Sequence, residues 1–244
     1  MRSILLAGAA SALGICFAAR AETIVSLYTG TSHTHSSDLR LRQPGTQSDA
    51  EFQGVHWQAR PFEDAPYYGV RISYFPTGRQ QLGASLDFTH YKLYAEAERV
   101  LAVRGEWNGA PVDDVSAMRA RVSDFEISHG VNLTSLNVQY RWGAERGTSP
   151  AGTRWQPHVG TGIVTYLPHA EGTVNGIAAS GDYQLAGFGY QLFAGTEYLL
   201  SGRLSLLVET KFDAGHLDID LDRATRAETR VRTLHALAGI ALHF

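Results

Sequence analysis

The C-terminal segment 231–244 alternates between an apolar face and a mainly polar face. Its apolar face consists of Leu234, Ala236, Ala238, Ile240, Leu242 and Phe244. The other face includes Thr233, His235, Gly239 and His243. A repeat of two residues is typical of a β-strand whose two faces meet different surroundings. A terminal aromatic residue is what the closing strand of an outer-membrane barrel has.

Other parts of the chain show the same alternation. We expect seven further strands at 22–33, 68–74, 82–88, 136–142, 155–167, 183–199 and 204–213. Eight is the smallest usual number of strands in a closed barrel, and an even number returns the chain to the side where it began. The sequence therefore predicts an all-β fold, an eight-stranded antiparallel up-and-down transmembrane β-barrel.

A soluble β-sandwich or lipocalin-like barrel is the competing fold. Its dry core would have to hold the polar faces of the expected strands, which include Arg71, Asp87, Glu209, Lys211 and Asp213. Unpaired charge in such a core is costly, whereas the lumen of a membrane barrel is normally polar. We expect these side chains, with His235, to pair structurally inside the barrel rather than to form an active site.

The N-terminal segment is typical of a secretory signal peptide. Arg2 precedes a short apolar run that ends at Ala19-Arg20-Ala21. We therefore expect a cleaved signal peptide at 1–21 and one barrel domain at 22–244. The only cysteine, Cys16, lies in the expected signal peptide, so disulfides and cysteine chemistry are excluded from the mature chain. Acidic side chains outnumber basic ones, 24 to 21, and nothing in the chain suggests nucleic acid.

The connections predict the orientation of the barrel. Short turns are expected at 76–80, 143–152 and 200–203, long external loops at 34–54 and 97–126, and a further external loop at 170–182. In bacterial barrels the short turns are periplasmic. We therefore expect the bacterial outer membrane as the location, with both termini on the periplasmic side.

Three histidines fall near the external end of consecutive strands. His90 continues the outward face of Leu86 and Phe88, and His169 continues that of Ile163. His129 shares a face with Val131 and Leu133, whereas Leu136 and Val138 lie on the alternate face, which implies a bulge near Thr134 or Ser135 that turns both sets outward. Side chains from adjacent strands can converge on one ion or one sugar hydroxyl, and three histidines are a known zinc ligand set. Lys92 on the same rim could pair with a phosphate.

Several segments together resemble one family, the small outer-membrane lipid A oxidases. They are Pro66-Tyr-Tyr-Gly-Val-Arg71, Phe88-Thr-His-Tyr-Lys-Leu-Tyr-Ala95, His129-Gly-Val-Asn132 with Leu136-Asn137, Pro168-His169 and Tyr183-Gln-Leu185. The resemblance implies the O₂-dependent oxidation of the proximal glucosamine of lipid A to 2-aminogluconate in the outer membrane. It also implies functional positions at His90, Lys92, His129, His169 and Gln184.

The roles of these residues are our inference. No side chain here activates O₂ unaided, and no nucleotide or flavin motif is visible, so a divalent transition metal is the economical cofactor. We expect His90, His129 and His169 to be the catalytic metal ligands, and Arg60, Lys92 and Gln184 to bind the sugar. The expected partners are lipid A or lipopolysaccharide of the outer leaflet, O₂, and the barrel-assembly machinery through Phe244.

Other functions remain open. The rim histidines and Lys92 could be an ordinary interfacial belt, and the chain could be a non-enzymatic adhesion or envelope-integrity barrel that binds through its long loops. The pair His33-Thr-His35 could bind a metal at the top of the first strand. A lipid A deacylase would require a histidine and serine pair on the lipid face, and we find none that is convincing.

Overall fold

The computed structural model of the protein describes residues 21–142 and 154–244. Residues 1–20 of the expected signal peptide and the expected turn at 143–152 lie outside the described residues. Within these ranges, no helix has the length and apolar character needed to cross a bilayer.

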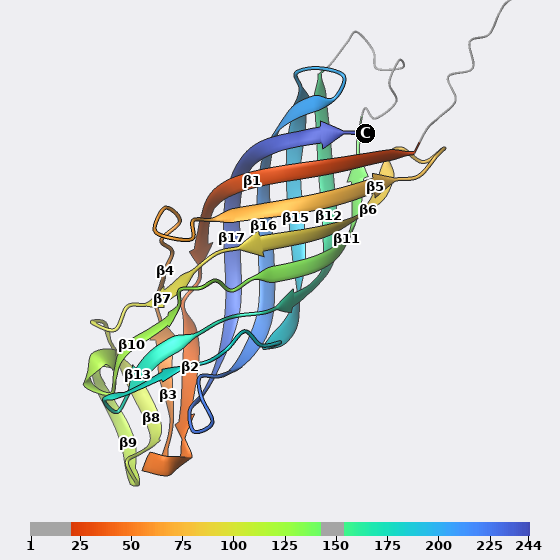
Figure 1. The fold of residues 1–244 in the computed structure, drawn as a ribbon. Helices are drawn as coiled ribbons and strands as arrows, with labels where there is room; N and C mark the ends of the chain where they lie inside the picture. The colour runs from red at the N-terminus through yellow and green to blue at the C-terminus, as the bar shows by residue number, and fades with distance from the viewer. Residues whose placement is uncertain (1–20, 143–153) are drawn as a thin grey trace, which may run out of the picture.

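Eight of the described strands close into one antiparallel barrel, as the sequence predicts (Figure 1). In order around the wall they are β1 (Glu22–Thr34), β5 (Tyr68–Phe75), β6 (Leu82–His90), β11 (Leu133–Arg141), β12 (Trp155–Tyr166), β15 (Gly187–Leu199), β16 (Leu204–Asp220) and β17 (Arg226–His243). The first and last strands pair from Ile24↔His243 to Thr34↔Thr233 and complete the circle. The start of β1 and the C-terminus lie at the same end of the barrel (Figure 1).

The outside of the barrel is an apolar band. Alternate residues of every wall strand point outward, and many of them are large and apolar. Examples that are between 44% and 69% exposed are Leu27, Ile72, Leu86, Leu136, Ile163, Leu192, Val208 and Ile240. Soluble monomers rarely expose a continuous apolar surface of this extent. The band is therefore the surface that faces lipid in a membrane barrel.

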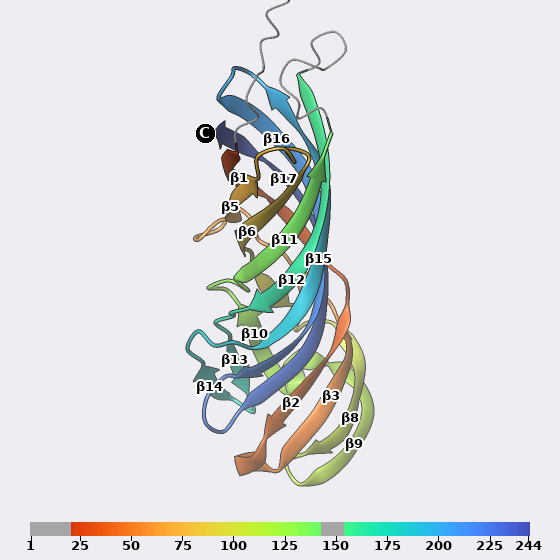
Figure 2. The same ribbon diagram turned by 90° about the vertical axis from the view of Figure 1, so that its right-hand side faces the viewer.

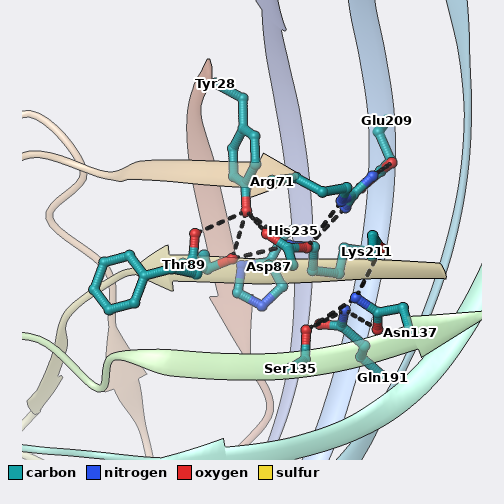
Figure 3. A network of polar contacts seen from close by, with 12 residues as sticks. Tyr28, Arg71, Asp87, Thr89, Ser135, Asn137, Gln191, Glu209, Lys211 and His235 are labelled. Atoms are coloured by element: carbon teal, nitrogen blue, oxygen red, sulfur yellow. Dashed lines mark hydrogen bonds and ion pairs between the residues drawn. The ribbon is translucent and has the colours of Figure 1, made fainter. Parts of the chain in front are cut away.

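The inside of the barrel is a closed network of polar side chains (Figure 3). The Arg71 guanidinium donates to Glu209 (2.6 Å) and Asp87 (2.9 Å), and the Lys211 ammonium also donates to Asp87 (2.8 Å). His235 pairs with Asp213 at 2.8 Å. All six side chains are buried, which confirms the expected structural pairing. A cavity beside Arg71 has a volume of about 20 Å³, room for about one water molecule.

Beyond the barrel end opposite the termini, the chain builds a second region, which we call the distal domain. It consists of two groups of strands, together with the end of β16 after Gly215 and the start of β17 before Val231, the residue that pairs with Gly215. The barrel sheet continues from β17 into β2 (Ser37–Gln43), β3 (Ser48–Val55), β8 (Val100–Trp107) and β9 (Ala110–Ala117). A separate sheet contains β4 (Trp57–Gln58), β7 (Leu93–Ala95), β10 (Val122–Ile127), β13 (Glu171–Val174) and β14 (Ile177–Ser180). Two single 3₁₀ turns, η1 (Pro44–Thr46) and η2 (Met118–Ala120), complete it.

The prediction of loops at 34–54, 97–126 and 170–182 was therefore wrong. These segments are largely paired strands, and the two sheets lie on opposite sides of the distal domain (Figure 2). Both sheets contribute to one apolar core, whose members include Leu39, Leu41, Phe52, Val103, Phe125, Ile127, Leu217 and Ile219, each at most 1% exposed. Burial of these side chains stabilises the strands, so the connections fold instead of remaining irregular.

The expected bulge near Thr134 or Ser135 is absent from β11. This strand keeps one unbroken register with β6, from Leu133↔Thr89 to Tyr140↔Leu82. Val131 and Leu133 are buried members of the distal core and point inward. Their apolar character suggested a lipid-facing side only because the barrel interior had been assumed to remain polar along its whole length.

Candidate functional site

Two of the three rim histidines meet at the junction between the barrel and the distal domain. His129 lies in the turn between β10 and β11, and His169 lies in the connection between β12 and β13. Their ring centroids are 4.4 Å apart. His129 is exposed and His169 is half-buried, so the pair can be reached from outside.

Backbone geometry holds this pair together. Gly130 adopts φ +99° and Asn132 φ +50°, which turns the chain sharply after His129. The Asn132 side-chain amide donates to the carbonyl oxygens of Gly130 (3.3 Å) and Leu167 (3.2 Å). The backbone N–H of His169 also donates to the Gly130 carbonyl, at 3.4 Å. The exposed position of His129 therefore results from this turn and not from a strand bulge.

Glu171 is the third member of the site, and the sequence analysis did not identify it. Its Oε1 lies 3.5 Å from Nε2 of His169. One ligand atom from each of His129, His169 and Glu171 lies within 4.8 Å of the others. The available signal was the spacing His169-x-Glu171, because residues two apart share one face of an extended segment.

The donor set of these three residues fits a divalent metal ion. Nε2 of His169 is buried and has no hydrogen-bond partner among the described residues. In addition, Glu171 on β13 lies directly opposite Glu126 on β10, and like charges in this position destabilise a strand pair. A cation would relieve both features. Two histidines and one carboxylate are the ligands of many non-haem Fe(II) sites, and imidazole also suits zinc and copper.

The third expected ligand, His90, lies outside this group. It occupies the outward face of β6, but its ring is covered, with 4% of its surface exposed. The ring stacks on Tyr68 at 4.9 Å, and Nδ1 hydrogen-bonds Oδ1 of Asn132 at 2.8 Å. A Cβ at Gly130 would lie 2.3 Å from the His90 ring, so only glycine fits there. His90 thus supports the turn that carries His129.

The residues expected to bind the sugar are engaged elsewhere in the fold. Lys92 is buried and donates to the backbone carbonyl of Asp64. The Arg60 guanidinium stacks on the Tyr94 ring at 4.0 Å. Burial raises the pKa of Tyr94, and the nearby Glu126 carboxylate adds to this effect.

Gln184 clamps the end of β16. Its Nε2 donates to the Asp220 carbonyl (2.8 Å), and its Oε1 accepts from the Asp220 N–H (2.9 Å). The side chain that faces the histidines is its neighbour Tyr183, whose ring lies 5.1 Å from that of His169. The Tyr183 hydroxyl donates to the His129 carbonyl at 3.2 Å, and the side chain is 59% exposed.

Comparisons with known proteins do not identify a family. No protein-family model matches the chain, and no curated protein has a significantly similar sequence. Among solved structures, the outer membrane protein OprG from Pseudomonas aeruginosa is 11% identical with a TM-score of 0.48, and the match covers 93% of this chain and 97% of OprG. Neisserial surface protein A is 12% identical with a TM-score of 0.43, over 92% of this chain and 97% of that protein.

A third similar structure is that of the outer membrane protein AlkL in lipid bilayers. It is 13% identical with a TM-score of 0.46, and the match covers 100% of this chain and 97% of AlkL. All three are outer-membrane proteins by name. Their identities and TM-scores are too low to carry an argument about activity, and the comparisons give no support to the resemblance to lipid A oxidases.

Proposed function

We propose that this chain is a small outer-membrane barrel that acts at the cell surface through its distal domain and distal rim, and that it is not a pore. The observation that carries the proposal is the closed lumen network of Arg71, Asp87, Glu209 and Lys211. A solute would have to break several buried ion pairs to pass it. The surface available for function is therefore the folded region beyond the barrel.

The proposed orientation places the termini in the periplasm and the distal domain outside. It rests on the short turn at 200–203 at one end and the large domain at the other, the usual asymmetry of bacterial barrels. Val115→Cys tests it, because the mature chain otherwise lacks cysteine and this side chain is 72% exposed. A membrane-impermeant maleimide should label it on intact cells. Ser201→Cys in the turn at 200–203 is the control and should react only after lysis. The reverse pattern would contradict the orientation.

A binding role without catalysis is the first candidate for the activity, and it needs no cofactor. Liposomes that contain the purified barrel should show no swelling in small sugars, because the lumen is closed. Swelling at porin-like rates would contradict the proposal. Assembly should depend on Phe244, whose side chain is 74% exposed at the end of the closing strand. Phe244→Ala should reduce the amount of folded barrel in the membrane.

Oxidation of lipid A is the second candidate, and one observation favours it: the group His129, His169 and Glu171 at the rim. A metal ion bound there would supply a redox centre for O₂. In this hypothesis the three side chains hold the ion, Glu126 adds negative charge beside it, and Tyr183 lies against the His169 ring. The exposed side of His129 leaves a route for a sugar from the membrane surface.

Mass spectrometry of lipid A separates the two candidates. Cells that produce the chain should show a gain of one oxygen on the proximal sugar if it is an oxidase. His129→Ala, His169→Ala and Glu171→Gln should each abolish that product, whereas His33→Ala, a histidine outside the group, should not. Unmodified lipid A with the folded wild-type chain would exclude the oxidase and leave the surface-barrel proposal intact.

A further inference from the structure

A second rim feature lies on the wall strands β15, β16 and β17 and includes none of His129, His169 and Glu171. It is a groove of about 840 Å³ that opens outward where the barrel meets the distal domain. Its lining includes Phe188, Tyr190, Ala214, His216, Arg230 and Arg232. Neither the binding role nor the oxidase hypothesis assigns it a ligand.

The groove lies at a change of chemistry along one strand face. The outward face of β17 is apolar from Leu242 up to Leu234 and then continues with Arg232 and Arg230. On β15 the outward residues Phe188 and Tyr190 are 67% and 52% exposed. Two cations thus lie directly above the lipid-facing band, beside two exposed aromatic rings.

The two arginines are not used by the fold. Arg230 and Arg232 are exposed, and neither forms an ion pair in the part of the chain that the structure describes. Other arginines of the same region are paired: Arg40 with Asp49, Arg42 with Glu228, and Arg226 with Asp218. Unpaired guanidinium groups in a concave site are suited to phosphate, which they bind with charge-assisted hydrogen bonds.

The acidic residues of the groove are engaged by groups other than these two arginines. Glu228 is held by the Arg42 guanidinium at 2.5 Å, and Oδ1 of Asp38 accepts from the Gly54 N–H at 2.8 Å. Oε1 of Glu51 accepts from Gln53 at 3.2 Å. Glu51 and Glu228 form one row with Arg40, so they lie further along the strands from the lipid-facing band than Arg230 and Arg232. An anion can therefore approach Arg230 and Arg232 from the membrane side.

The strand register provides space for a sugar between the ring and the cation. Tyr190 pairs with Ala214, and Ala214 pairs with Arg232, so the three form one row across the wall. Because neighbouring strands are ~4.8 Å apart, Tyr190 and Arg232 are separated by roughly 10 Å of backbone. The small side chain of Ala214 leaves that interval open as the floor of the groove.

We propose that this groove binds a phosphorylated glycolipid of the outer leaflet. Arg230 and Arg232 hold the phosphate, and an acyl chain lies along Phe188 and Tyr190. The inference rests on the proposed outward orientation of the distal domain, since only then does the groove meet the outer leaflet. It does not require that the chain oxidise the lipid.

Native mass spectrometry of the purified barrel in detergent tests the proposal. The probes are bisphosphorylated lipid A, dephosphorylated lipid A and inorganic phosphate. We expect the first to bind and the second to bind about tenfold more weakly, a difference of about 1.4 kcal/mol, because it lacks the charge-assisted phosphate contact. Inorganic phosphate at equal concentration should not displace the lipid, because it lacks the acyl contact.

Charge variants locate the site. R230Q/R232Q should weaken binding of bisphosphorylated lipid A by about tenfold or more. The control R203Q/R223Q removes the same charge from exposed turns outside the groove and should leave binding unchanged. Equal binding of phosphorylated and dephosphorylated lipid A, which needs no variant, would overturn the proposal. So would unchanged binding of R230Q/R232Q, or full displacement by inorganic phosphate.

This test is independent of the proposed function. Binding in detergent does not depend on orientation or catalysis. A barrel that is labelled at V115C from outside but does not prefer phosphorylated lipid A refutes only the groove. A barrel that shows this preference but is labelled only after lysis refutes the cell-surface role, and with it the outer-leaflet origin of the lipid, but not the recognition of phosphate by the groove.

Discussion

The barrel and the distal domain share strands but have opposite interiors. Along β16 the inward face carries Glu209, Lys211 and Asp213 inside the barrel, and Leu217 and Ile219 in the distal domain. The strand keeps one register with β17 from Leu204↔Leu242 to Asp220↔Arg226, so no bulge accompanies the change. Whether the inward face of a strand is polar or apolar therefore depends on whether that part of the strand lies in the barrel or in the distal domain.

The surroundings explain the difference. A lipid-facing wall must be apolar outside, and its narrow interior can hold polar groups only as paired networks. A region in water must bury its apolar side chains instead. One continuous sheet can satisfy both conditions because its alternation stays the same and only the residue types change. Four predictions, ordered by expected size, test this contrast.

The largest effect is expected for charge inside the barrel. Lys211→Met removes a cation that is 0% exposed and bonded to Asp87. Loss of one partner of a buried pair should lower the free energy of unfolding by about 3–5 kcal/mol. Arg40→Met removes an exposed cation of the distal domain and should change it by less than about 1 kcal/mol. Urea unfolding in micelles, followed by circular dichroism, gives both values. Equal losses would break the contrast.

Truncation of a leucine should have the opposite pattern, with the larger loss of stability in the distal domain. Leu41 is 1% exposed in the distal core, and Leu41→Ala should destabilise that domain by about 2–5 kcal/mol because it leaves a cavity. Leu206 faces lipid and is 44% exposed, so Leu206→Ala should have a smaller effect. The measurement is protease resistance of the distal domain alongside heat resistance of the barrel. If Leu41→Ala unfolds both together, the two regions are one cooperative unit.

Two valines with similar exposure test which surface contacts lipid and which contacts water. Val208, near the middle of the wall, is 60% exposed, and Val115 on β9 is 72% exposed. Val208→Arg should destabilise the barrel by about 2–4 kcal/mol, because the charge enters hydrocarbon. Val115→Arg should change stability by at most about 0.5 kcal/mol. Folding into lipid bilayers at a series of urea concentrations measures both. A small effect at Val208 would show that this face does not contact lipid.

The contrast also explains which parts of the fold could be predicted from sequence. The eight wall strands were identifiable because the lipid-facing side chains are uniformly apolar, as in Leu234 to Leu242. Distal strands were interpreted as loops because their apolar alternation is weaker; β9, for example, contains the adjacent Asp113 and Asp114 and has no buried side chain. Val131 and Leu133 show the error most directly: a correct alternation was assigned to the wrong side.

The site was predictable only in part for a similar reason. The alternation of the strands placed His90, His129 and His169 near one rim, but alternation does not show which neighbouring residues cover a side chain. Asn132 and Gly130 enclose His90 through backbone conformations that the sequence does not specify uniquely. Glu171 could have been found by extending the strand beyond His169. Arg230 was missed because the last strand was taken to begin at Val231, and Arg232 was missed because its outward face was described only from Leu234 onward.

The smallest expected effect concerns an exposed ion pair of the distal domain. The hydrogen bond from Arg40 lowers the pKa of Asp49 below its ordinary value of 3.8. The ionised carboxylate therefore stabilises the domain above pH 3.8, and this stabilisation is lost as the pH falls through the lowered pKa. Both side chains are 44% exposed, so solvent screening limits the effect to about 0.2–1 kcal/mol. Asp49→Asn should reduce resistance to proteolysis of the distal domain slightly at pH 7, and the difference from wild type should shrink as the pH falls below 3.8 and through the lowered pKa of Asp49. A difference that persists in acid would mean that packing, and not charge, is responsible, unlike the buried pairs of the lumen.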